Sequence, residues 1–375
     1  MKSQATFNTS KLNIDVSKPV LVTGATGYVA GVTIKQLLEH GVTVHATVRD
    51  PTNTQRLQYL QQLADKSPGG KIKFFAGDLL KMGSFKDAME GCEIVFHMAS
   101  PFTVEVHDPQ KELIDPAVLG TENVLLQANQ TPTVKRVIVT SSVMAIHSDN
   151  VDGNDLTEET WNRTSSLTHN PYALSKTLAE QKAWVIAGSQ KQWTLVTICP
   201  SFVCGPGLKY SKTSESYQLV KQMGSNDPAM AAGLPNLGMI PVDVRDVATA
   251  HIVAAYTPGA SGRYIASPGK GYMWPELGKI LGNDKYCNFK AKGYPIVTKA
   301  APLPKFMFWL LGPYVAKGLT RKWVWNNIGF CASYDTTKSK VELGMKYRPV
   351  QVTLGDMYQQ LIDEGIVSST NSQKK

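Results

Sequence analysis

The sequence has few cysteines and no long apolar run. Its five cysteines are odd in number and form no CxxC pair, so we expect neither a disulfide framework nor a metal site. A reducing, cytoplasmic compartment fits this cysteine usage best. No segment reaches about 18 uninterrupted apolar residues, so we expect no transmembrane segment. The polar stretch 1–18 also lacks the apolar core of a signal peptide.

A dense basic stripe or tail is missing as well. The 39 lysines and arginines exceed the 30 acidic residues and give a formal charge of +9, but they are scattered along the chain. Nucleic acid is therefore not an expected partner. The basic excess instead fits the attraction of an anionic cofactor or small-molecule substrate. We expect a monomer or a homodimer.

What the sequence does contain is a glycine-rich turn between a β-branched run and an amphipathic segment. Residues 23–31 have the sequence TGATGYVAG, and Ile34–Leu38 continues with helical spacing. Gly24 can take backbone angles that other residues avoid, and Gly27 lets the backbone approach a pyrophosphate bound at the helix N-terminus. An ordinary strand–turn–helix is the alternative. The strand expected at 42–48 favours a dinucleotide site.

A cation stands where such a fold recognises the adenosine ribose. Arg49 ends the second expected strand, 25 residues after Gly24. An acidic residue here would accept hydrogen bonds from a free 2′-hydroxyl, whereas an arginine pairs with a 2′-phosphate. Arg56 supplies a second positive charge, and strand alternation turns the neighbouring Asp50 another way. A solvated surface arginine is the alternative. We predict NADP(H) as the cofactor.

Strand-like and helical segments alternate through the first 200 residues. This pattern predicts an α/β fold with a Rossmann-type doubly wound parallel sheet. Beyond the first two strands, we expect strands at 71–76, 93–97, 136–141 and 193–199, and helices at 54–64, 82–89, 110–128 and 170–187.

After residue 200, glycine and proline recur between short helical pieces, which is typical of a smaller, irregular α/β substrate domain. We expect an NADP(H)-binding domain at 1–200, with 237–257 returning to it. The substrate-binding annex is expected at 201–236 and 258–375.

A tyrosine and a lysine lie one helical turn apart at Tyr172 and Lys176. A phenol titrates near pH 10, and a neighbouring ammonium would lower its pKa toward neutrality. Ser142, at the end of the fifth expected strand, can hydrogen-bond a carbonyl oxygen beside the tyrosine. The three groups suit hydride transfer to a carbonyl, with Tyr172 giving the proton. A surface helix pair is the alternative, but the nucleotide turn and five strands precede the pair in the right order.

The order of these motifs resembles the extended short-chain dehydrogenase/reductases, and within them the dihydroflavonol 4-reductase-like branch of aldehyde and ketone reductases. The similarity covers most of the chain to about residue 265 and returns at 335–344. The matching segments are Thr23–Ala30, Thr47–Pro51, Gly77–Leu79, Phe96–Pro101, Thr140–Ser142, Tyr172–Glu180 and Val242–Ala248.

The resemblance implies a role for particular residues. It makes Ser142, Tyr172 and Lys176 the catalytic triad and implies no metal. The cofactor-binding set that it implies is Gly24, Thr26, Gly27, Tyr28, Val29, Arg49, Arg56, Asp78, Leu79, Ala99, Ser100, Thr140, Tyr172, Lys176, Pro200, Phe202 and Val203. The residues expected to line the substrate are Pro101, Phe102, Met144, His147 and Ser201.

Two departures from the family pattern bear on the substrate. His147 stands where plant dihydroflavonol enzymes carry Asn or Asp. Asn170-Pro171-Tyr172-Ala173 replaces the Asn-Trp-Tyr-Cys signature of cinnamoyl-CoA reductases. Neither a flavonoid nor a CoA thioester is therefore an expected substrate.

Other features have plainer interpretations. His97, at a strand end, is expected to be a packed core histidine, and Cys199 and Cys204 to be small apolar liners of the site. Segment 306–316 is short and interrupted by Gly312-Pro313, so a buried or substrate-lining helix is expected, with docking to a membrane surface less favoured. Three nearby tryptophans are expected in the core, with an aromatic substrate wall as the alternative: Trp309, Trp323 and Trp325.

The leading hypothesis is an NADPH-dependent reductase of an aldehyde or ketone, reversible as an alcohol dehydrogenase. A 3β-hydroxysteroid dehydrogenase-like enzyme is the closer rival, because its substrate is also apolar. An NAD-dependent sugar epimerase or dehydratase is disfavoured by Arg49. A non-catalytic NADP-binding regulator is disfavoured because serine, tyrosine and lysine are all retained.

Overall fold

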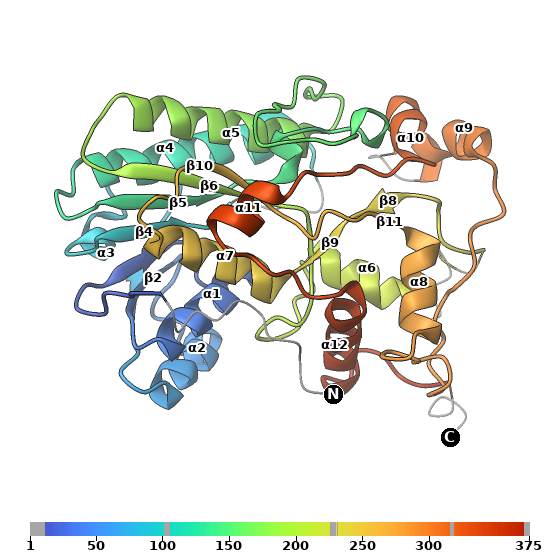
Figure 1. Ribbon diagram of the computed structural model, residues 1–375, viewed down its shortest axis with the longest axis horizontal. Coiled ribbons are helices and arrows are strands. Elements are labelled where there is room, and N and C mark those ends of the chain that lie inside the picture. The colour runs from blue at the N-terminus through green and yellow to red at the C-terminus, as the bar shows by residue number, and fades with distance from the viewer. Residues whose placement is uncertain (1–11, 101–105, 226–229, 231, 316–318, 371–375) are drawn as a thin grey trace.

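The computed structural model describes residues 12–100, 106–225, 230, 232–315 and 319–370. Within these residues one large parallel sheet contains seven strands: β1 (Val20–Val22), β2 (Thr43–Val48), β3 (Lys71–Ala76), β4 (Ile94–His97), β5 (Arg136–Thr140), β6 (Thr194–Pro200) and β10 (Gly262–Ala266). Their order is β10-β6-β5-β4-β1-β2-β3 (Figure 1). The chain thus runs outward from β1 in both directions, with the switch point between β1 and β4. This confirms the predicted Rossmann-type, doubly wound sheet.

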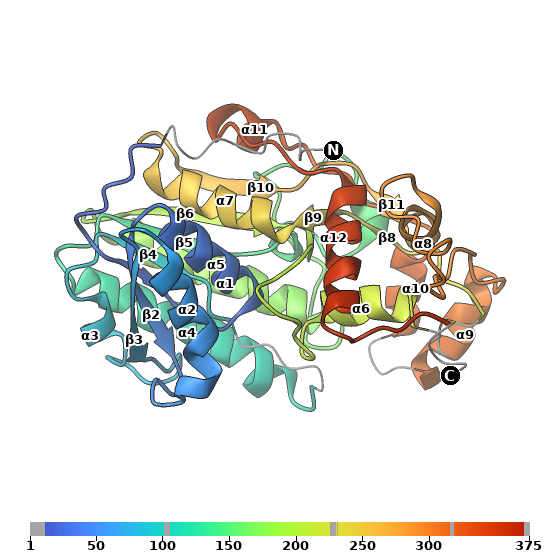
Figure 2. The ribbon, with the colours of Figure 1, turned by 90° about the horizontal axis from the view of Figure 1, so that it is seen from below.

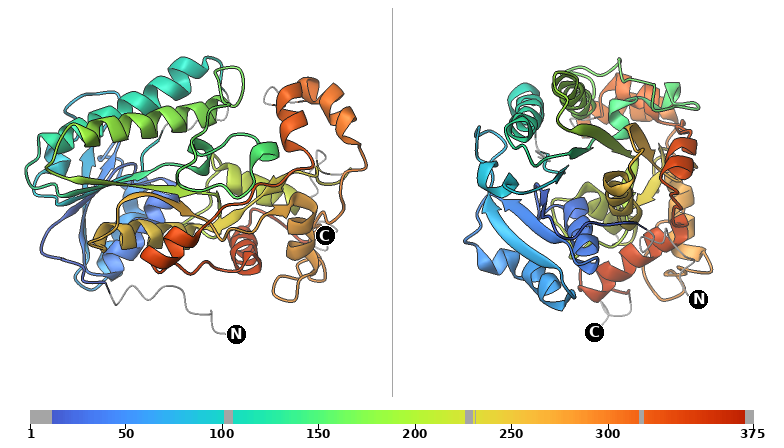
Figure 3. Two further views of the ribbon diagram at one scale, coloured as in Figure 1. Left: turned by 45° about the horizontal axis from the view of Figure 1, so that its top comes forward. Right: turned by 60° about the vertical axis from the view of Figure 1, so that its left-hand side comes forward.

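Alternate residues of the strands pack on opposite faces of this sheet. Val20 and Val22 join the core cluster beneath one set of helices, whereas Leu21 between them joins the cluster on the other side. The first face is covered by α1 (Tyr28–Glu39), α2 (Thr54–Lys66) and α7 (Val244–Tyr256), and the second by α3 (Lys86–Met89), α4 (Asp115–Asn129) and α5 (Pro171–Gly188). Figure 3 shows the sheet between these two layers. Burial on both faces explains why its inner strands are almost continuously apolar.

A smaller part of the molecule surrounds the carboxyl ends of the strands. Its two short sheets pair β7 (Phe202–Cys204) with β9 (Pro241–Asp243), and β8 (Gly238–Met239) with β11 (Tyr272–Met273). Its helices are α6 (Glu215–Met223), α8 (Trp274–Asn283), α9 (Lys305–Val315), α10 (Arg321–Asn327) and α12 (Val350–Asp363). Tyr217, Leu277 and Tyr358 belong to a separate core that unites α6, α8 and α12.

Three strands do not follow the predicted division between the two parts of the chain. β10 falls within 258–375, which we assigned to the annex, yet it pairs with β6 at the edge of the large sheet. Conversely, β8 and β9 fall within 237–257 but pair in the two small sheets. β6 would otherwise present an open row of backbone groups, and β10 satisfies them. α11 (Thr337–Glu342) also lies beside β10. The other domain boundaries stay a prediction.

The apolar segment 306–316 is not buried as expected. Within it, the side chains of Phe306 and Tyr314 are 59% and 81% exposed. α9 packs against α10 with one side and turns the other to solvent, which corrects the prediction of a buried helix. No helix in the described ranges combines the length and the apolar character needed to cross a bilayer.

Candidate active site

The glycine-rich turn presents the N-terminus of α1 to a cavity. Gly24 has a φ of 69°, and a Cβ built there would lie 2.9 Å from Ala99 Cα. Only glycine therefore fits both the turn and the loop beside it. Gly27 precedes the helix, and its amide donates to Gly24 O at 2.8 Å. The amides of the first helical turn have no acceptor within the helix and are oriented to bind an anion.

Thr23 joins this turn to the loop after β4. Its hydroxyl oxygen accepts from the amides of Met98 and Ala99 at 3.1 and 3.0 Å, and it lies 3.0 Å from His97 Nδ1. Burial lowers the pKa of His97 to about 3, so its ring is neutral. A neutral ring bonded inside the core agrees with a packed histidine rather than a proton shuttle.

The start of α5 turns Tyr172 toward the same cavity. Asn170 adopts a left-handed conformation with a φ of 52°, and its side chain accepts from Ala173 N at 3.3 Å. Pro171 occupies the first helical position, where no amide hydrogen is needed. Tyr172 therefore lies in the first turn, and Lys176 follows one turn later on the same face.

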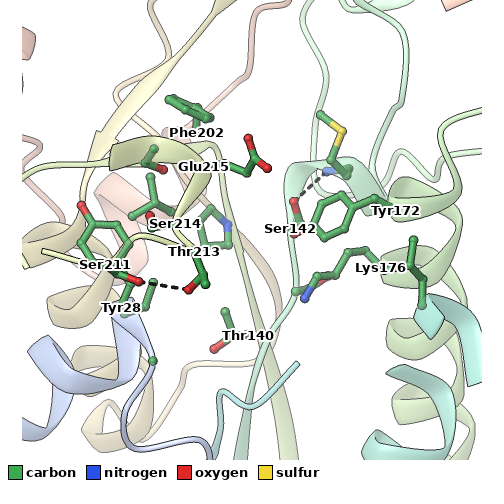
Figure 4. Close-up of a pocket in the computed structure, with 18 of the residues that line it drawn as sticks. Tyr28, Thr140, Ser142, Tyr172, Lys176, Phe202, Ser211, Thr213, Ser214 and Glu215 are labelled. Atoms are coloured by element: carbon green, nitrogen blue, oxygen red, sulfur yellow. Dashed lines mark hydrogen bonds between the residues drawn. The ribbon is translucent and has the colours of Figure 1, made fainter. Parts of the chain in front are cut away.

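The three predicted catalytic side chains lie together on the cavity wall (Figure 4). Ser142 follows β5 and caps the short 3₁₀ turn Val143–Ala145, accepting from Met144 N at 3.1 Å. Lys176 Nζ donates to Ser100 Oγ at 3.0 Å and lies 5.8 Å from the centre of the Tyr172 ring. The structure thus places a hydroxyl, a phenol and an ammonium at one site.

Burial sets the protonation of the tyrosine and the lysine. It raises the pKa of Tyr172 to about 12 and lowers the pKa of Lys176 to about 8. The prediction that the lysine brings the tyrosine pKa toward neutrality is wrong for this structure, because removal of the ring from water dominates and the ammonium is bonded to Ser100. At neutral pH the phenol keeps its proton and most of the lysine is charged. Tyr172 therefore has a proton to donate.

A buried ion pair fastens α5 to the sheet behind these groups. Arg263 of β10 donates to the Glu180 carboxylate from Nε at 2.8 Å and from Nη2 at 3.1 Å. The same carboxylate accepts from Ser141 Oγ at 2.5 Å and from Thr197 Oγ1 at 2.7 Å. These bonds tie the end of β5, β6 and β10 to the helix that carries Tyr172.

The cavity extends from the first turn of α1 to α5 and has a volume of about 1450 Å³. Figure 4 shows two groups of side chains that face each other across the cavity. One group is Ser142, Tyr172 and Lys176, and the other is Tyr28, Ser211, Thr213, Ser214 and Glu215. Pockets for one small ligand are typically about 300–1,000 Å³, so this space suits a dinucleotide beside a small substrate.

Most residues of the predicted cofactor-binding set lie on the wall of this cavity: Thr26, Gly27, Tyr28, Val29, Arg56, Thr140, Tyr172, Lys176, Pro200, Phe202 and Val203. Ala99 and Ser100 line a small adjoining hollow together with Lys176. Gly24 acts through the shape of the turn, as described above.

Three members of that set lie beyond the cavity wall. Arg49 is exposed at the end of β2, and Asp50 beside it accepts from the Thr52 amide and hydroxyl at 2.9 and 2.6 Å. Asp78 accepts from the Leu80 amide at 2.9 Å. Leu79 packs against Gly120. Their contact with an adenosine moiety stays a prediction.

Only two of the five residues predicted to line the substrate lie on the described wall of the cavity. Met144 and Ser201 line the cavity. Pro101 and Phe102 lie outside the described residues.

His147 does not belong to the described part of the cavity wall. It is buried, and its ring lies 5.5 Å from the Tyr334 ring, because the 3₁₀ turn after Ser142 carries the chain inward. This burial does not favour contact with the substrate, and the assignment stays a prediction. Cys199 and Cys204, which we expected as liners, are likewise buried away from the described wall.

Several cavity residues were not predicted. Lys209 Nζ lies 4.2 Å from the Tyr59 ring, and both residues line the cavity near Arg56. A glycine–proline run just before Lys209 was the one sequence signal for a loop there. Trp323 and Thr320 line the cavity from the start of α10, so Trp323 is not a core residue, and its contact with a substrate stays a prediction.

Taken with the sheet topology, this geometry defines an extended short-chain dehydrogenase/reductase of the predicted dihydroflavonol 4-reductase-like branch. Comparison with known proteins agrees. The chain belongs to the 3-beta hydroxysteroid dehydrogenase/isomerase family, whose model matches residues 21–266.

Several known reductases match between 65% and 93% of this chain. Tetraketide alpha-pyrone reductase 1 of Arabidopsis thaliana is 32% identical over 358 residues, which cover 93% of this chain and 97% of that protein. Cinnamoyl-CoA reductase CAD2 of Medicago truncatula is 38% identical over 250 residues, which cover 65% of this chain and 74% of that protein. The crystal structure of Gre2 from Candida albicans in complex with NADPH is 28% identical, with a TM-score of 0.73, and the match covers 92% of this chain and 99% of that one. Membership of this family makes the chain an oxidoreductase.

Proposed function

We propose that the protein is an NADPH-dependent reductase that converts the carbonyl group of a small apolar aldehyde or ketone to an alcohol, in a reversible reaction. The observation that carries this proposal is a single cavity that joins the glycine-rich turn to Ser142, Tyr172 and Lys176. The reductase names of the relatives support it.

The donor set along the cavity fits a phosphorylated dinucleotide. The first-turn amides of α1 would hold the pyrophosphate, and Arg56 with Arg49 would hold the 2′-phosphate. Lys176 and Tyr172 would lie at the nicotinamide ribose, with Pro200–Val203 beside the ring. Bound NADPH would supply a hydride to the carbonyl carbon. The NADPH complex of the Candida albicans protein supports this choice of cofactor.

The chain itself supplies the proton and the charge that assists its transfer. The Ser142 hydroxyl donates to the substrate carbonyl oxygen and holds it beside Tyr172. The Tyr172 O–H then donates its proton to that oxygen as negative charge develops there. The Lys176 ammonium, which is charged at neutral pH, stabilises the phenolate that remains. The raised pKa of Tyr172 suits this direction of reaction, because the phenol is protonated before the substrate arrives.

The walls near these groups favour an apolar substrate. Met144, Phe202 and Trp323 line the cavity, and apolar groups beside a carbonyl would be removed from water against them.

A panel assay tests the proposal. We expect oxidation of NADPH, with formation of an equal amount of alcohol, for at least one class among aliphatic aldehydes, diketones, dihydroflavonols and ketosteroids. NADH should support a much lower rate. Preference for NADH, together with conversion of nucleotide sugars, would overturn the proposal in favour of an epimerase or dehydratase. Tight NADPH binding without turnover of any carbonyl would overturn it in favour of a regulator.

A further inference from the structure

The positive charge of the chain is concentrated in one segment. Residues 285–334 contain eight lysines and arginines and no aspartate or glutamate, so they carry +8 of the formal charge of +9. The cations are Lys285, Lys290, Lys292, Lys299, Lys305, Lys317, Arg321 and Lys322. They are spaced singly, which is why the sequence shows no dense basic stripe. The missing acids, rather than clustered bases, make the segment basic.

The same segment holds much of the exposed apolar surface. We call residues 303–315 and 319–330, which include α9 and α10, the aromatic hairpin. Of the 16 large apolar side chains that are exposed in the described residues, eight belong to it: Leu303, Phe306, Trp309, Leu310, Leu311, Tyr314, Trp325 and Phe330. The hairpin lies at the opposite end of the molecule from α3 (Figures 1 and 2). Such a concentration on one projecting element marks an interaction surface.

α9 turns an apolar stripe to solvent. Phe306, Trp309, Leu310 and Tyr314 recur at the spacing of one helix face and are 59%, 38%, 44% and 81% exposed. The inward side contains Gly312, where a Cβ would lie 3.3 Å from Val324 of α10. The two helices therefore pack closely through small contacts and leave the large side chains outside.

Cations and aromatic rings alternate over this surface. Lys305 Nζ lies 4.9 Å from the Trp325 ring and 4.3 Å from the Phe330 ring. The Arg321 guanidinium lies 5.1 Å from the Trp309 ring. Tryptophan and tyrosine side chains combined with long cationic ones are typical of elements that rest at the headgroup level of a bilayer.

We propose that the aromatic hairpin docks the protein on the surface of an anionic phospholipid bilayer. Phe306, Trp309, Leu310 and Tyr314 enter the headgroup region. The described cations of the same hairpin, Lys305, Arg321 and Lys322, lie on the anionic headgroups. The charge of this surface favours an anionic bilayer over a second copy of the chain as its partner. A two-fold dimer through this face would bring the same acid-free segment against itself, so like charges would meet.

The docked surface is connected to the cavity. Trp323 and Thr320 line the cavity, whereas Trp325, two residues further along α10, is 58% exposed on the outside. One short helix thus contacts both the cavity and the proposed membrane surface. If the proposed reductase function holds, an apolar carbonyl compound dissolved in the bilayer reaches the cavity from this side. The docking itself does not depend on that activity.

Vesicle co-sedimentation of the full chain tests the proposal. We expect binding to vesicles of phosphatidylcholine with phosphatidylserine, little binding to phosphatidylcholine alone, and weakening by salt. Arg321→Glu with Lys322→Glu, both exposed on α10, should reduce the affinity by roughly twentyfold or more, since each cation contributes on the order of fivefold. Lys66→Glu with Lys86→Glu makes the same change of charge on other exposed sites and should have a much smaller effect.

Apolar contact is tested with a second matched pair. Leu310→Ser with Tyr314→Ser should weaken vesicle binding by roughly tenfold, because two side chains lose their burial. Met82→Ser with Val341→Ser removes exposed apolar side chains elsewhere and should leave binding unchanged. All variants should keep the wild-type melting temperature and the wild-type NADPH oxidation with a water-soluble carbonyl compound.

Three results would overturn the docking proposal. The first is wild-type protein that fails to bind anionic vesicles. The second is binding that the hairpin variants and their controls lose equally. The third is a wild-type dimer, seen in sedimentation velocity, that Leu310→Ser with Tyr314→Ser dissociates, because a second copy would then cover the face. Vesicle binding without reductase activity would refute only the proposed function.

Discussion

The wall of the cavity that carries Tyr172 differs from the opposite wall in what holds it in place. Behind the catalytic side chains, Thr140 lies 2.8 Å from the buried His251 ring, and the Glu180–Arg263 pair fixes α5. On the opposite wall, the Ser211 and Thr213 hydroxyls hydrogen-bond at 3.1 Å (Figure 4). This pair is exposed to solvent.

This contrast separates the chemistry from recognition of the substrate. Buried charged and polar partners restrict the catalytic wall to one arrangement, because any displacement leaves a polar group without its bond in a region of low dielectric. Short hydroxyl side chains on a surface loop lose little when the loop is rebuilt. One wall is therefore expected to resist change and the other to accept it.

The largest effect should come from the proton donor on the fixed wall. Tyr172→Phe keeps the ring but removes its dissociable proton, so kcat should fall by roughly two to four orders of magnitude. Single-turnover reduction at saturating NADPH measures this without interference from product release. Tyr314→Phe, at an exposed position outside the described cavity wall, is the control. Near-normal turnover by Tyr172→Phe would mean that another group supplies the proton.

The next largest effect should come from the buried ion pair that supports the catalytic wall, and it should appear as a loss of stability. Glu180→Gln leaves the Arg263 charge buried without its partner, and the free energy of unfolding should fall by about 3–5 kcal/mol. Urea denaturation measures the loss. Glu122→Gln breaks the pair with Lys182, whose side chains are 30% and 35% exposed, and should cost less than about 1 kcal/mol. Equal losses for the two variants would contradict the special role of the buried pair.

The cofactor end should give a smaller, selective effect. Arg56→Ala and Arg49→Ala each remove a cation expected at the 2′-phosphate, so the KM for NADPH should rise by roughly ten- to a hundredfold. Steady-state kinetics with both cofactors measures the change, and the KM for NADH should stay nearly constant. Wild-type protein that binds NADH as tightly as NADPH would refute the assignment of both arginines.

The smallest effect should separate Trp323, which lines the cavity from α10, from His147 in the core behind the catalytic wall. Trp323→Ala enlarges the cavity and should change the ranking of carbonyl substrates by a few-fold in kcat/KM, with the KM for NADPH preserved. His147→Asn, buried against Tyr334, should leave the ranking unchanged. A panel of carbonyl compounds compares the two variants. An altered ranking for His147→Asn would show that this residue affects substrate binding after all.

Short sequence motifs were sufficient to predict the parallel sheet and part of the candidate active site. The glycine turn, the β-branched runs and the one-turn spacing of Tyr172 and Lys176 are each encoded within a few residues, and the structure places them at one cavity. The resemblance to a family added the order of the motifs.

Features that depend on distant partners could not be predicted in this way. β10 was assigned to the wrong part of the chain because the sequence of a short strand does not indicate which sheet edge it pairs with. α9 was expected to be buried because an apolar run looks the same whether it faces a core or an outside surface. Trp323 lies 151 residues from Tyr172 in the sequence, and only the folded chain shows that both line one cavity. The pKa of Tyr172 was mispredicted because the spacing of Tyr172 and Lys176 on a helix does not reveal how deeply the phenol is buried.

The bond from Arg263 to Glu180 also orders events in time. Its two partners are separated by 83 residues, so α5 is synthesised well before the strand that neutralises its buried carboxylate. At about 5–20 residues per second, the ribosome needs roughly 4–17 s to cover that interval. During those seconds the nascent helix carries a charge that has no place in an apolar interior. The helix with the active-site tyrosine therefore completes its docking only after β10 has emerged, which delays assembly of the site until most of the chain has been made.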